Sequence, residues 1–287
     1  MTARGRLLSV LVATVIALAG FVTVGAPAAA AGPTGTLQYV ALGDSYAAGI
    51  GAPPYRSVSL GDKICVQSIN MGYPGLLDLE KDIALQVNGN ATCPGATTTD
   101  VAAFVASPLN PLDEDTRLVT LTVGGNDLGF GDLFETCATP GEEAQCLIDI
   151  ANAVTDEQLT DLGSDLTRLY GDVANAAPNA LIVVTGYPYL FEPDPNNPII
   201  TAFNKATAAL NKTIKDAVKD TDNDNIVYVD VTKEFKHHGI GSDEPFINDP
   251  SFGFPEFFHP NAAGYGAYAE AISAAIRKAL DKQKQLV

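Results

Sequence analysis

Short apolar runs alternate with longer amphipathic stretches along most of this chain. Five of the runs are rich in valine, isoleucine and leucine and are not interrupted by a regular polar alternation. Such a pattern is typical of parallel strands that are covered on both faces of a sheet. We expect these strands at residues 37–42, 83–87, 118–123, 180–185 and 226–230.

Helical periodicity appears in the stretches that separate or follow these runs. Residues 199–218 and 265–280 place apolar side chains at intervals of three, four and seven, and Asn261 is a suitable N-cap for the second of these helices. Strands that alternate with helices favour a parallel sheet between two helical layers. The sequence therefore predicts an α/β fold, a three-layer α/β/α sandwich with a central parallel sheet of about five strands.

The first residues have the features of an export signal. Arg4 and Arg6 precede a long apolar run, which ends in the small residues 29–31 with an A-x-A pattern. The run is nearly long enough to span a bilayer, but its alanine and glycine content and its small-residue exit favour a cleaved signal over an anchor. We expect a signal peptide at residues 1–31 and a single secreted, extracellular domain at residues 32–287, since no repeat or long linker follows.

The charge balance excludes some classes of partner. The chain has 34 acidic residues against 17 basic ones, and loss of the signal would remove two of the basic ones. A strongly acidic surface repels nucleic acid and anionic membranes at long range. We expect no nucleic-acid partner, no stable membrane insertion after signal cleavage, and a monomer.

Four cysteines in an exported chain predict two disulfides, for which three connectivities exist. The closure of short local loops favours Cys65 with Cys93 and Cys137 with Cys146. A metal site is disfavoured because the chain lacks close C-x-x-C pairs with histidines nearby. We therefore expect two disulfides and no metal.

Polar residues follow two of the predicted strands. Gly43, Asp44 and Ser45 come after the first strand, and residues 124–127 come after the third. Ligands of such sheets bind beyond the carboxyl ends of the strands, so we expect these two segments to form one site. Ser45 is the candidate nucleophile there, and a serine hydroxyl requires a base that removes its proton.

The chain has three histidines from which that base can come. His237 and His238 are adjacent in a polar stretch, whereas His259 lies just before the last predicted helix and three residues after Glu256. A lone histidine in a loop is usually a packed or solvated residue. The combination with Ser45 and a nearby carboxylate favours His259 as the general base.

Acyl transfer also requires donors for the negative charge that develops on the carbonyl oxygen. The side-chain amide of Asn126, on a turn that contains Gly125, is one candidate. The main-chain N–H groups of Gly95 and of Ser45 itself are two others. We expect Ser45, Gly95 and Asn126 to form an oxyanion hole.

These residues resemble the GDSL, or SGNH, hydrolases, and especially the secreted actinobacterial esterases and lipases of that superfamily. Four blocks carry the resemblance in order over nearly all of the mature chain: residues 40–49, 93–98, 121–127 and 258–265. The resemblance implies the SGNH-hydrolase, flavodoxin-like fold. It also implies the nucleophile at Ser45, oxyanion donors at Gly95 and Asn126, and the catalytic histidine at His259.

The chain departs from the family pattern at two positions. Tyr46 replaces the leucine of the GDSL motif, which we expect to affect packing or the substrate rim more than the chemistry. Glu256 replaces the aspartate of the D-x-x-H motif. Either its carboxylate orients His259, the alternative favoured slightly, or the main-chain carbonyl at that position does so and Ser45 and His259 act as a dyad.

The sequence thus predicts a secreted serine carboxylic-ester hydrolase, an esterase or lipase that acts by Ser-His acyl transfer and requires no cofactor. Its substrate would be an acyl lipid or a small ester. A carbohydrate O-acetylesterase or a phospholipase of the same fold is an alternative. A secreted binding protein that has lost catalysis is a further one, disfavoured because Ser45, Gly95, Asn126 and His259 are all present.

Overall fold

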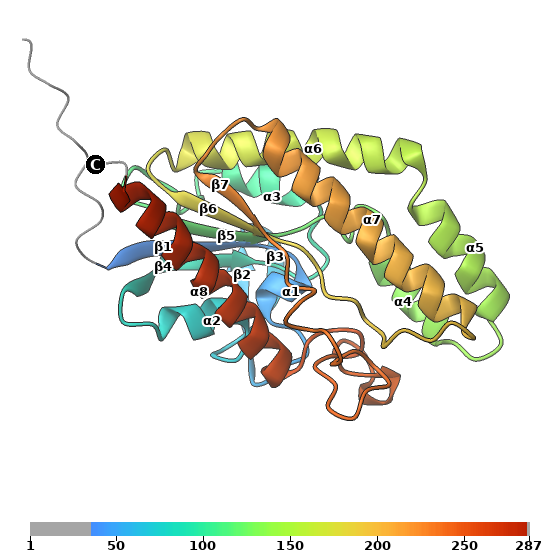
Figure 1. The fold of residues 1–287 in the computed structure, drawn as a ribbon. Helices are drawn as coiled ribbons and strands as arrows, with labels where there is room; N and C mark the ends of the chain where they lie inside the picture. The colour runs from blue at the N-terminus through green and yellow to red at the C-terminus, as the bar shows by residue number, and fades with distance from the viewer. Residues whose placement is uncertain (1–35, 286–287) are drawn as a thin grey trace, which may run out of the picture. The chain divides into compact units, whose positions relative to one another are not determined.

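Five parallel strands form the central sheet in the computed structural model, which describes residues 36–285 (Figure 1). The strands are β1 (Leu37–Gly43), β4 (Ile83–Thr92), β5 (Leu118–Thr122), β6 (Leu181–Thr185) and β7 (Ile226–Val229), in the spatial order β4-β1-β5-β6-β7. The order of connection reverses between β1 and β5. In open α/β sheets, a crevice for ligands forms at this point, beyond the carboxyl ends of the strands.

All five expected strands are present, but β4 is longer than predicted. It continues to Thr92 because it pairs with β1 in two stretches, with an irregularity opposite the step from Tyr39 to Ala41. Asn88, with a φ of 59°, lies in that irregularity. The Asn-Gly-Asn sequence there is typical of a turn, but here it forms a bulge within the strand.

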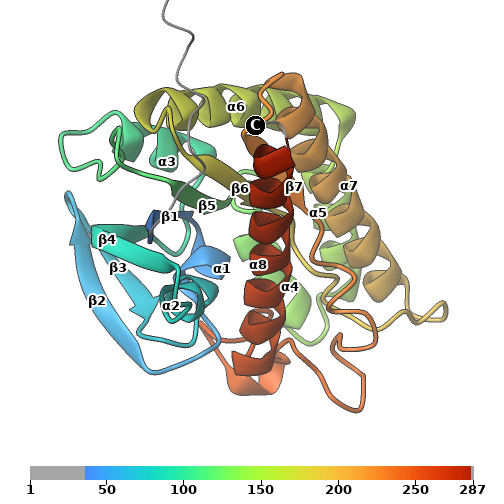
Figure 2. The same cartoon turned by 60° about the vertical axis from the view of Figure 1, so that its left-hand side comes forward.

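Helices cover both faces of the sheet (Figures 1 and 2). The short α2 (Tyr73–Asp78) and the C-terminal α8 (Ala262–Gln285) lie on one face, and α3 (Thr98–Val105), α6 (Asp156–Ala176) and α7 (Pro198–Asp220) lie on the other. The arrangement confirms the predicted three-layer sandwich. The apolar side chains of residues 203, 210 and 214 on α7 are buried, as their helical spacing predicts.

The core of the sheet contains hydroxyl groups as well as aliphatic side chains. Every residue of β5 and β6 is buried, because helices cover both faces. The Thr122 hydroxyl lies 2.9 Å from the hydroxyl of Tyr73 and 2.5 Å from that of Thr185. Buried polar groups are costly unless they are hydrogen-bonded, and these are paired with each other. They link neighbouring strands next to the carboxyl edge of the sheet.

Two disulfide-bonded segments outside the central sheet extend the fold near the carboxyl edge of the sheet. A hairpin of β2 (Tyr55–Leu60) and β3 (Lys63–Ser68) is attached by the Cys65–Cys93 disulfide. The helices α4 (Phe130–Ala138) and α5 (Glu143–Ala153) are joined by the Cys137–Cys146 disulfide. The pairings are those that local loop closure favours. Neither the hairpin nor the α4–α5 pair was among the predicted elements.

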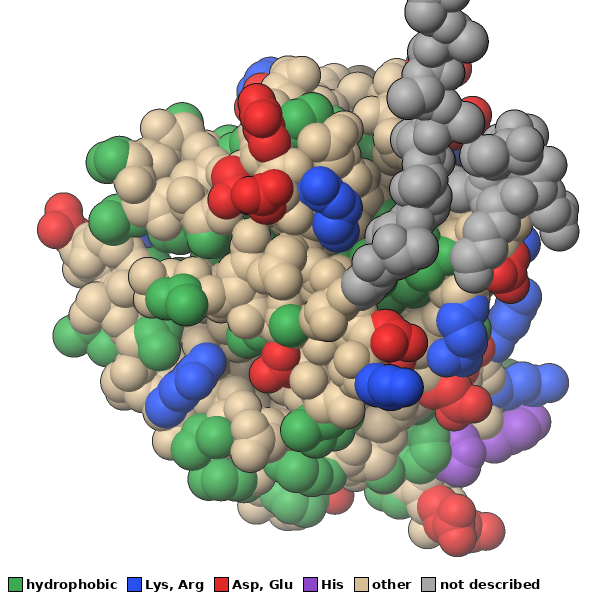
Figure 3. All heavy atoms as spheres, turned by 90° about the vertical axis from the view of Figure 1, so that its left-hand side faces the viewer, with side chains coloured by type: hydrophobic (Ala, Val, Ile, Leu, Met, Phe, Trp, Pro, Cys, Tyr) green, Lys and Arg blue, Asp and Glu red, His purple; other side chains and the backbone are tan. Residues whose placement is uncertain are grey.

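The described residues form one compact unit. Within residues 36–285, no helix is long and apolar enough to cross a membrane. The expected signal peptide, residues 1–31, lies outside the described residues. On the face shown in Figure 3, acidic and basic side chains are interspersed with hydrophobic ones.

Candidate active site

Ser45 lies at the reversal point of the sheet, where β1 ends and the four-residue helix α1 (Ser45–Ala48) begins. The preceding Gly43 has a φ of 127°, and a Cβ atom there would lie 2.1 Å from the carbonyl oxygen of Thr122. Only glycine allows this close approach of β1 to β5. Asp44 then caps α1 by accepting a hydrogen bond from the Tyr46 N–H at 2.9 Å. The local sequence therefore presents the serine on a tight turn.

The segment after β5 lies against the segment that contains Gly95. The side-chain amide of Asn126 donates to the carbonyl oxygen of Ala96 at 3.0 Å. The Asp127 carboxylate accepts hydrogen bonds from the N–H and the hydroxyl of Thr98 at 3.0 and 2.5 Å. A primary amide has two hydrogens, so one fixes the orientation of Asn126 and the second is available to a ligand.

Gly95 has a φ of 80°, and no atom lies within 4 Å of the position that a Cβ would occupy. The left-handed conformation favours glycine, and the lack of a side chain leaves space above its backbone. A cleft of about 770 Å³ opens here, and it brings together four of the five predicted active-site residues, whereas Glu256 does not line it. Its lining includes Ser45, Gly95, Asn126 and His259, with Phe134, Phe254 and Phe257 among the apolar side chains.

His259 contacts Ser45 directly. Its Nε2 atom lies 2.8 Å from the Ser45 Oγ atom, and its Nδ1 atom lies 3.0 Å from the carbonyl oxygen of Phe257. A carbonyl oxygen only accepts hydrogen bonds, so Nδ1 carries the proton and Nε2 is left to accept the proton of the serine. Burial of the imidazole, which is 9% exposed, lowers the pKa of His259 from 6.5 to about 4. The ring is therefore neutral at neutral pH, as a general base must be.

The arrangement around Glu256 differs from both expectations for that residue. Its carboxylate accepts a hydrogen bond from the Tyr55 hydroxyl at 3.3 Å, and its main-chain carbonyl accepts one from Asn248 at 3.3 Å. The oxygen next to Nδ1 belongs instead to Phe257, one residue further along. Phe258 has a φ of 61°, so the chain turns between Glu256 and His259.

Tyr46 is buried and does not line the cleft of about 770 Å³. Its side chain is 4% exposed, and its hydroxyl donates to the carbonyl oxygen of Phe258 at 2.5 Å. The tyrosine thereby connects the residue after Ser45 with the residue before His259. Of the two effects that the sequence left open for Tyr46, packing is the one that the structure supports.

Tyr187 is a site residue that sequence reasoning missed. Its hydroxyl donates to Asp44 at 2.5 Å and accepts a hydrogen bond from the Gly125 N–H at 3.1 Å. It therefore joins the turn that carries Ser45 to the turn that carries Asn126. Tyr187 follows the carboxyl end of β6 by two residues, so the search for polar residues after strands could have found it.

Two buried carboxylates brace these turns. Burial raises the pKa of Asp44 from 3.8 to about 7, although the hydroxyl of Tyr187 and main-chain N–H groups partly counteract the effect of burial. Burial likewise raises the pKa of Asp127, against its hydrogen bonds with Thr98. Each carboxylate is occupied by donors within the protein, which fits a structural role.

The other two histidines lie elsewhere. The ring of His238 stacks on that of Phe246 at 3.7 Å, and His237 lies 3.7 Å from the Glu192 carboxylate. Within the described part of the chain, no group of three or more histidine, cysteine, aspartate and glutamate side chains could hold a metal ion.

Comparison with known proteins identifies the family. The model of the GDSL-like lipase/acylhydrolase family matches residues 41–267, a range that contains every residue of the site described above. The chain belongs to this family. Membership confirms the resemblance noted in the sequence and the SGNH-hydrolase fold. It also confirms that the protein belongs to a family of ester hydrolases.

This GDSL-like hydrolase has similar relatives in Streptomyces. It is 34% identical to Lipase 1 of Streptomyces coelicolor, over 95% of this chain and 99% of that protein. It is 35% identical to a lipase of Streptomyces rimosus, over 84% and 87% of the two chains. Among solved structures, phospholipase A1 of Streptomyces albidoflavus matches with a TM-score of 0.72 and 31% identity, over 83% of this chain and 99% of that one.

Proposed function

We propose that the protein is a secreted serine carboxylic-ester hydrolase in which Ser45 is the nucleophile and His259 the general base. The contact of 2.8 Å between His259 Nε2 and Ser45 Oγ carries the proposal. A nucleophile and a base within hydrogen-bonding distance, at the mouth of a cleft, are what acyl transfer requires. The depressed pKa of His259 supports the role of base, since the ring is unprotonated at neutral pH.

In the first step, Nε2 takes the proton of Ser45 as Oγ attacks the ester carbonyl. The proton then passes to the leaving alcohol, and an acyl-serine remains. Water is activated by the same nitrogen and attacks the acyl group, which releases the acid and returns the proton to Ser45. Each step needs Nδ1 to stay protonated, and the Phe257 carbonyl at 3.0 Å keeps that tautomer.

The negative charge on the carbonyl oxygen would be held by the N–H groups of Ser45 and Gly95 and by the Asn126 amide. Two observations support this assignment. The amide of Asn126 is already oriented by its bond to Ala96, and the backbone of Gly95 faces open space. Donors that are fixed before the reaction lower the barrier because they do not reorganise during it.

The cleft favours an acyl ester with an extended apolar part. Its volume of about 770 Å³ is large for an acetyl group, and Ile50, Phe134 and Phe257 are among the side chains that line it. Three relatives are named as lipases or as a phospholipase A1. We therefore propose fatty-acyl esters, including phospholipids, as substrates in preference to acetylated carbohydrates.

Two observations support secretion. Residues 1–31 have the features of a signal peptide, and a similar solved structure is that of an extracellular lipase from Streptomyces rimosus. The two disulfides also fit an oxidising compartment outside the cytoplasm. We propose that the mature domain begins at residue 32 and acts as a monomer. N-terminal sequencing of the secreted protein would test that boundary.

The proposal is tested by comparing the wild type with Ser45→Ala on p-nitrophenyl esters from acetate to palmitate. A phosphatidylcholine and an acetylated xylan serve as the other two substrate classes. We expect hydrolysis of the longer esters and the phospholipid by the wild type, and none by a folded Ser45→Ala. Turnover that survives in Ser45→Ala would place the nucleophile elsewhere. A wild type that acts only on acetylated xylan would make the protein a carbohydrate esterase, and one that hydrolyses nothing would favour a binding protein.

A further inference from the structure

Two phenylalanines next to the cleft face solvent. Phe252 is 60% exposed and Phe254 is 88% exposed, and they are the only exposed phenylalanines among the described residues. Single exposed apolar side chains are common on soluble proteins. These two differ because they lie two residues apart on the loop that leads to His259, and we refer to them together as the aromatic edge.

The aromatic edge is continuous with the wall of the cleft. Phe254 and the following Pro255 line the cleft together with Ser45 and His259. The ring of Phe254 lies 6.3 Å from that of Phe257, at an angle of 61°, and Phe257 lines the cleft further along the same loop. An apolar path therefore leads from the outer surface to the reacting groups.

The segment that presents the aromatic edge is held in place by hydrogen bonds. Asp249 caps the single turn Pro250–Phe252 and accepts from the Ser251 N–H at 2.7 Å. The N–H groups of Glu256 and Phe257 both bond to the carbonyl of Gly253 at 3.0 Å. Binding through an ordered segment loses little conformational entropy, so the exposed rings are ready to be buried.

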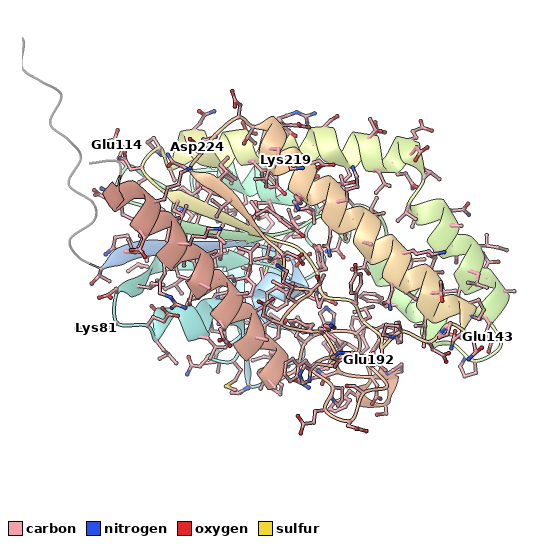
Figure 4. The ribbon with its side chains drawn as sticks, viewed as in Figure 1. Lys81, Glu114, Glu143, Glu192, Lys219 and Asp224 are labelled. Atoms are coloured by element: carbon pink, nitrogen blue, oxygen red, sulfur yellow. A yellow bond between two sulfur atoms is a disulfide. The ribbon has the colours of Figure 1, made fainter. Side chains whose placement is uncertain are left out.

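Charge indicates which kind of surface would bury them. Residues 237–276 contain no lysine or arginine. Acidic residues lie at this end of the molecule: Glu135 lines the cleft, and Figure 4 shows Glu143 and Glu192 on segments at the same end of the sheet. Anionic lipid attracts basic clusters and repels acidic ones. An uncharged or zwitterionic lipid surface matches an aromatic edge on a segment without basic residues, because aromatic side chains favour the interfacial region.

A protein partner fits this surface less well. Each phenylalanine can bury about 150–250 Å², whereas a stable protein interface buries roughly 800 Å² on each partner. Two rings fall short of that area. A lipid surface has no such minimum, since each inserted side chain contributes to reversible binding by itself.

We propose that Phe252 and Phe254 dock the mouth of the cleft reversibly onto the surface of an uncharged or zwitterionic lipid aggregate. This inference rests on the proposed function, since it supplies the route by which an aggregated acyl ester reaches Ser45. The edge orients the cleft toward the lipid, and an acyl chain enters along Phe254 and Phe257. Soluble esters reach the same serine without docking.

Docking is measured first without catalysis, on vesicles of a dialkyl-ether phosphatidylcholine, which contains no ester bond. The proteins are the wild type, Phe252→Ser, Phe254→Ser and the matched control Leu79→Ser. Leu79 is 72% exposed at the end of α2 and does not line the cleft. We expect each phenylalanine substitution to weaken binding about tenfold, the low end of what burial of a phenylalanine contributes, and Leu79→Ser to bind as the wild type does.

Vesicles of the ether phosphatidylglycerol should bind the wild type more weakly at low salt. Docking is overturned if the wild type and the phenylalanine variants bind the vesicles equally well. It is also overturned if Leu79→Ser loses as much affinity as the phenylalanine variants do, or if the wild type binds phosphatidylglycerol more tightly. A wild type that forms dimers which either phenylalanine substitution dissociates would also overturn it, because the edge would then be a protein interface.

Hydrolysis by Phe252→Ser provides the second measurement, because Phe252 does not line the cleft. We expect its rate on ester phosphatidylcholine vesicles to fall about tenfold, while kcat and KM for p-nitrophenyl acetate stay within about twofold of the wild type. A wild type that hydrolyses no ester refutes the proposed function. An active wild type with the same vesicle rate in Phe252→Ser refutes docking alone.

Discussion

Nδ1 of His259 lies 3.0 Å from the main-chain carbonyl oxygen of Phe257. A neutral carbonyl therefore occupies the position where hydrolases with a full triad have a carboxylate. It fixes the orientation and the tautomer of the ring, but it has no full negative charge to stabilise the imidazolium that forms during the reaction. These contacts support the proposed dyad of Ser45 and His259, with the ring oriented by the backbone.

Substitution of Glu256 tests this dyad. The Glu256 carboxylate bonds to Tyr55 and not to His259, so both Glu256→Gln and Glu256→Ala should keep most of the wild-type kcat. Glutamine can still accept the Tyr55 hydrogen bond and should behave like the wild type. Steady-state kinetics on a soluble ester measure this. A loss of about 10²-fold or more in Glu256→Gln would show that the carboxylate stabilises the imidazolium.

Tyr46→Phe should lower kcat about tenfold with little change in KM. The substitution keeps the ring but removes the hydroxyl that holds the Phe258 carbonyl, so His259 would be less well aligned with Ser45. Tyr39→Phe is the matched control, because Tyr39 is also fully buried and its hydroxyl bonds to Thr120 in the core. If kcat fell by the same factor in both variants, the cause would be a general loosening of the fold and not poorer alignment of His259.

Asn126→Ala should lower kcat by about 10²-fold while KM stays nearly constant. The amide stabilises charge that develops only in the transition state, so ground-state binding should not depend on it. Thermal melting should accompany the kinetics, because the bond from Asn126 to Ala96 is lost as well. An effect confined to KM would remove Asn126 from the oxyanion hole.

The pH profile of kcat/KM should show an acid limb below pH 6.5, centred at about 4. Burial disfavours the charged imidazolium, so His259 stays neutral and active as a base until the pH falls toward that value. A limb near 6.5 would indicate a solvated ring. An inflection near 7 that disappears in Asp44→Asn would instead report the buried Asp44 carboxyl.

The sheet and the position of the candidate site at its edge were predictable because their signals are local. Non-alternating apolar runs marked all five strands, and the rule that sites lie at the carboxyl ends of strands pointed to Ser45 and Asn126. The bulge in β4 was not predictable, since Asn88 and its neighbours read as the end of a strand. Its formation depends on pairing with β1, a contact that is distant in sequence.

The oxygen that faces the ring of His259 could not be predicted from the sequence for a related reason. The spacing of Glu256 pointed to a carboxylate, but the left-handed conformation of Phe258 decides which oxygen faces the ring. A bulky residue rarely adopts that conformation, and it does so here where Tyr46, more than two hundred residues away in the chain, holds its carbonyl. A pattern within one segment does not reveal such a contact.

The central claim is that Ser45 is the nucleophile activated by His259, and labelling with a fluorophosphonate tests it most directly. Intact mass and peptide mapping should find one adduct per chain, on Ser45, and His259→Ala should react at least about 10²-fold more slowly because the base is absent. The contact of 2.8 Å between the two side chains predicts this dependence. An adduct on another serine, or an unchanged rate of labelling in His259→Ala, would contradict the account.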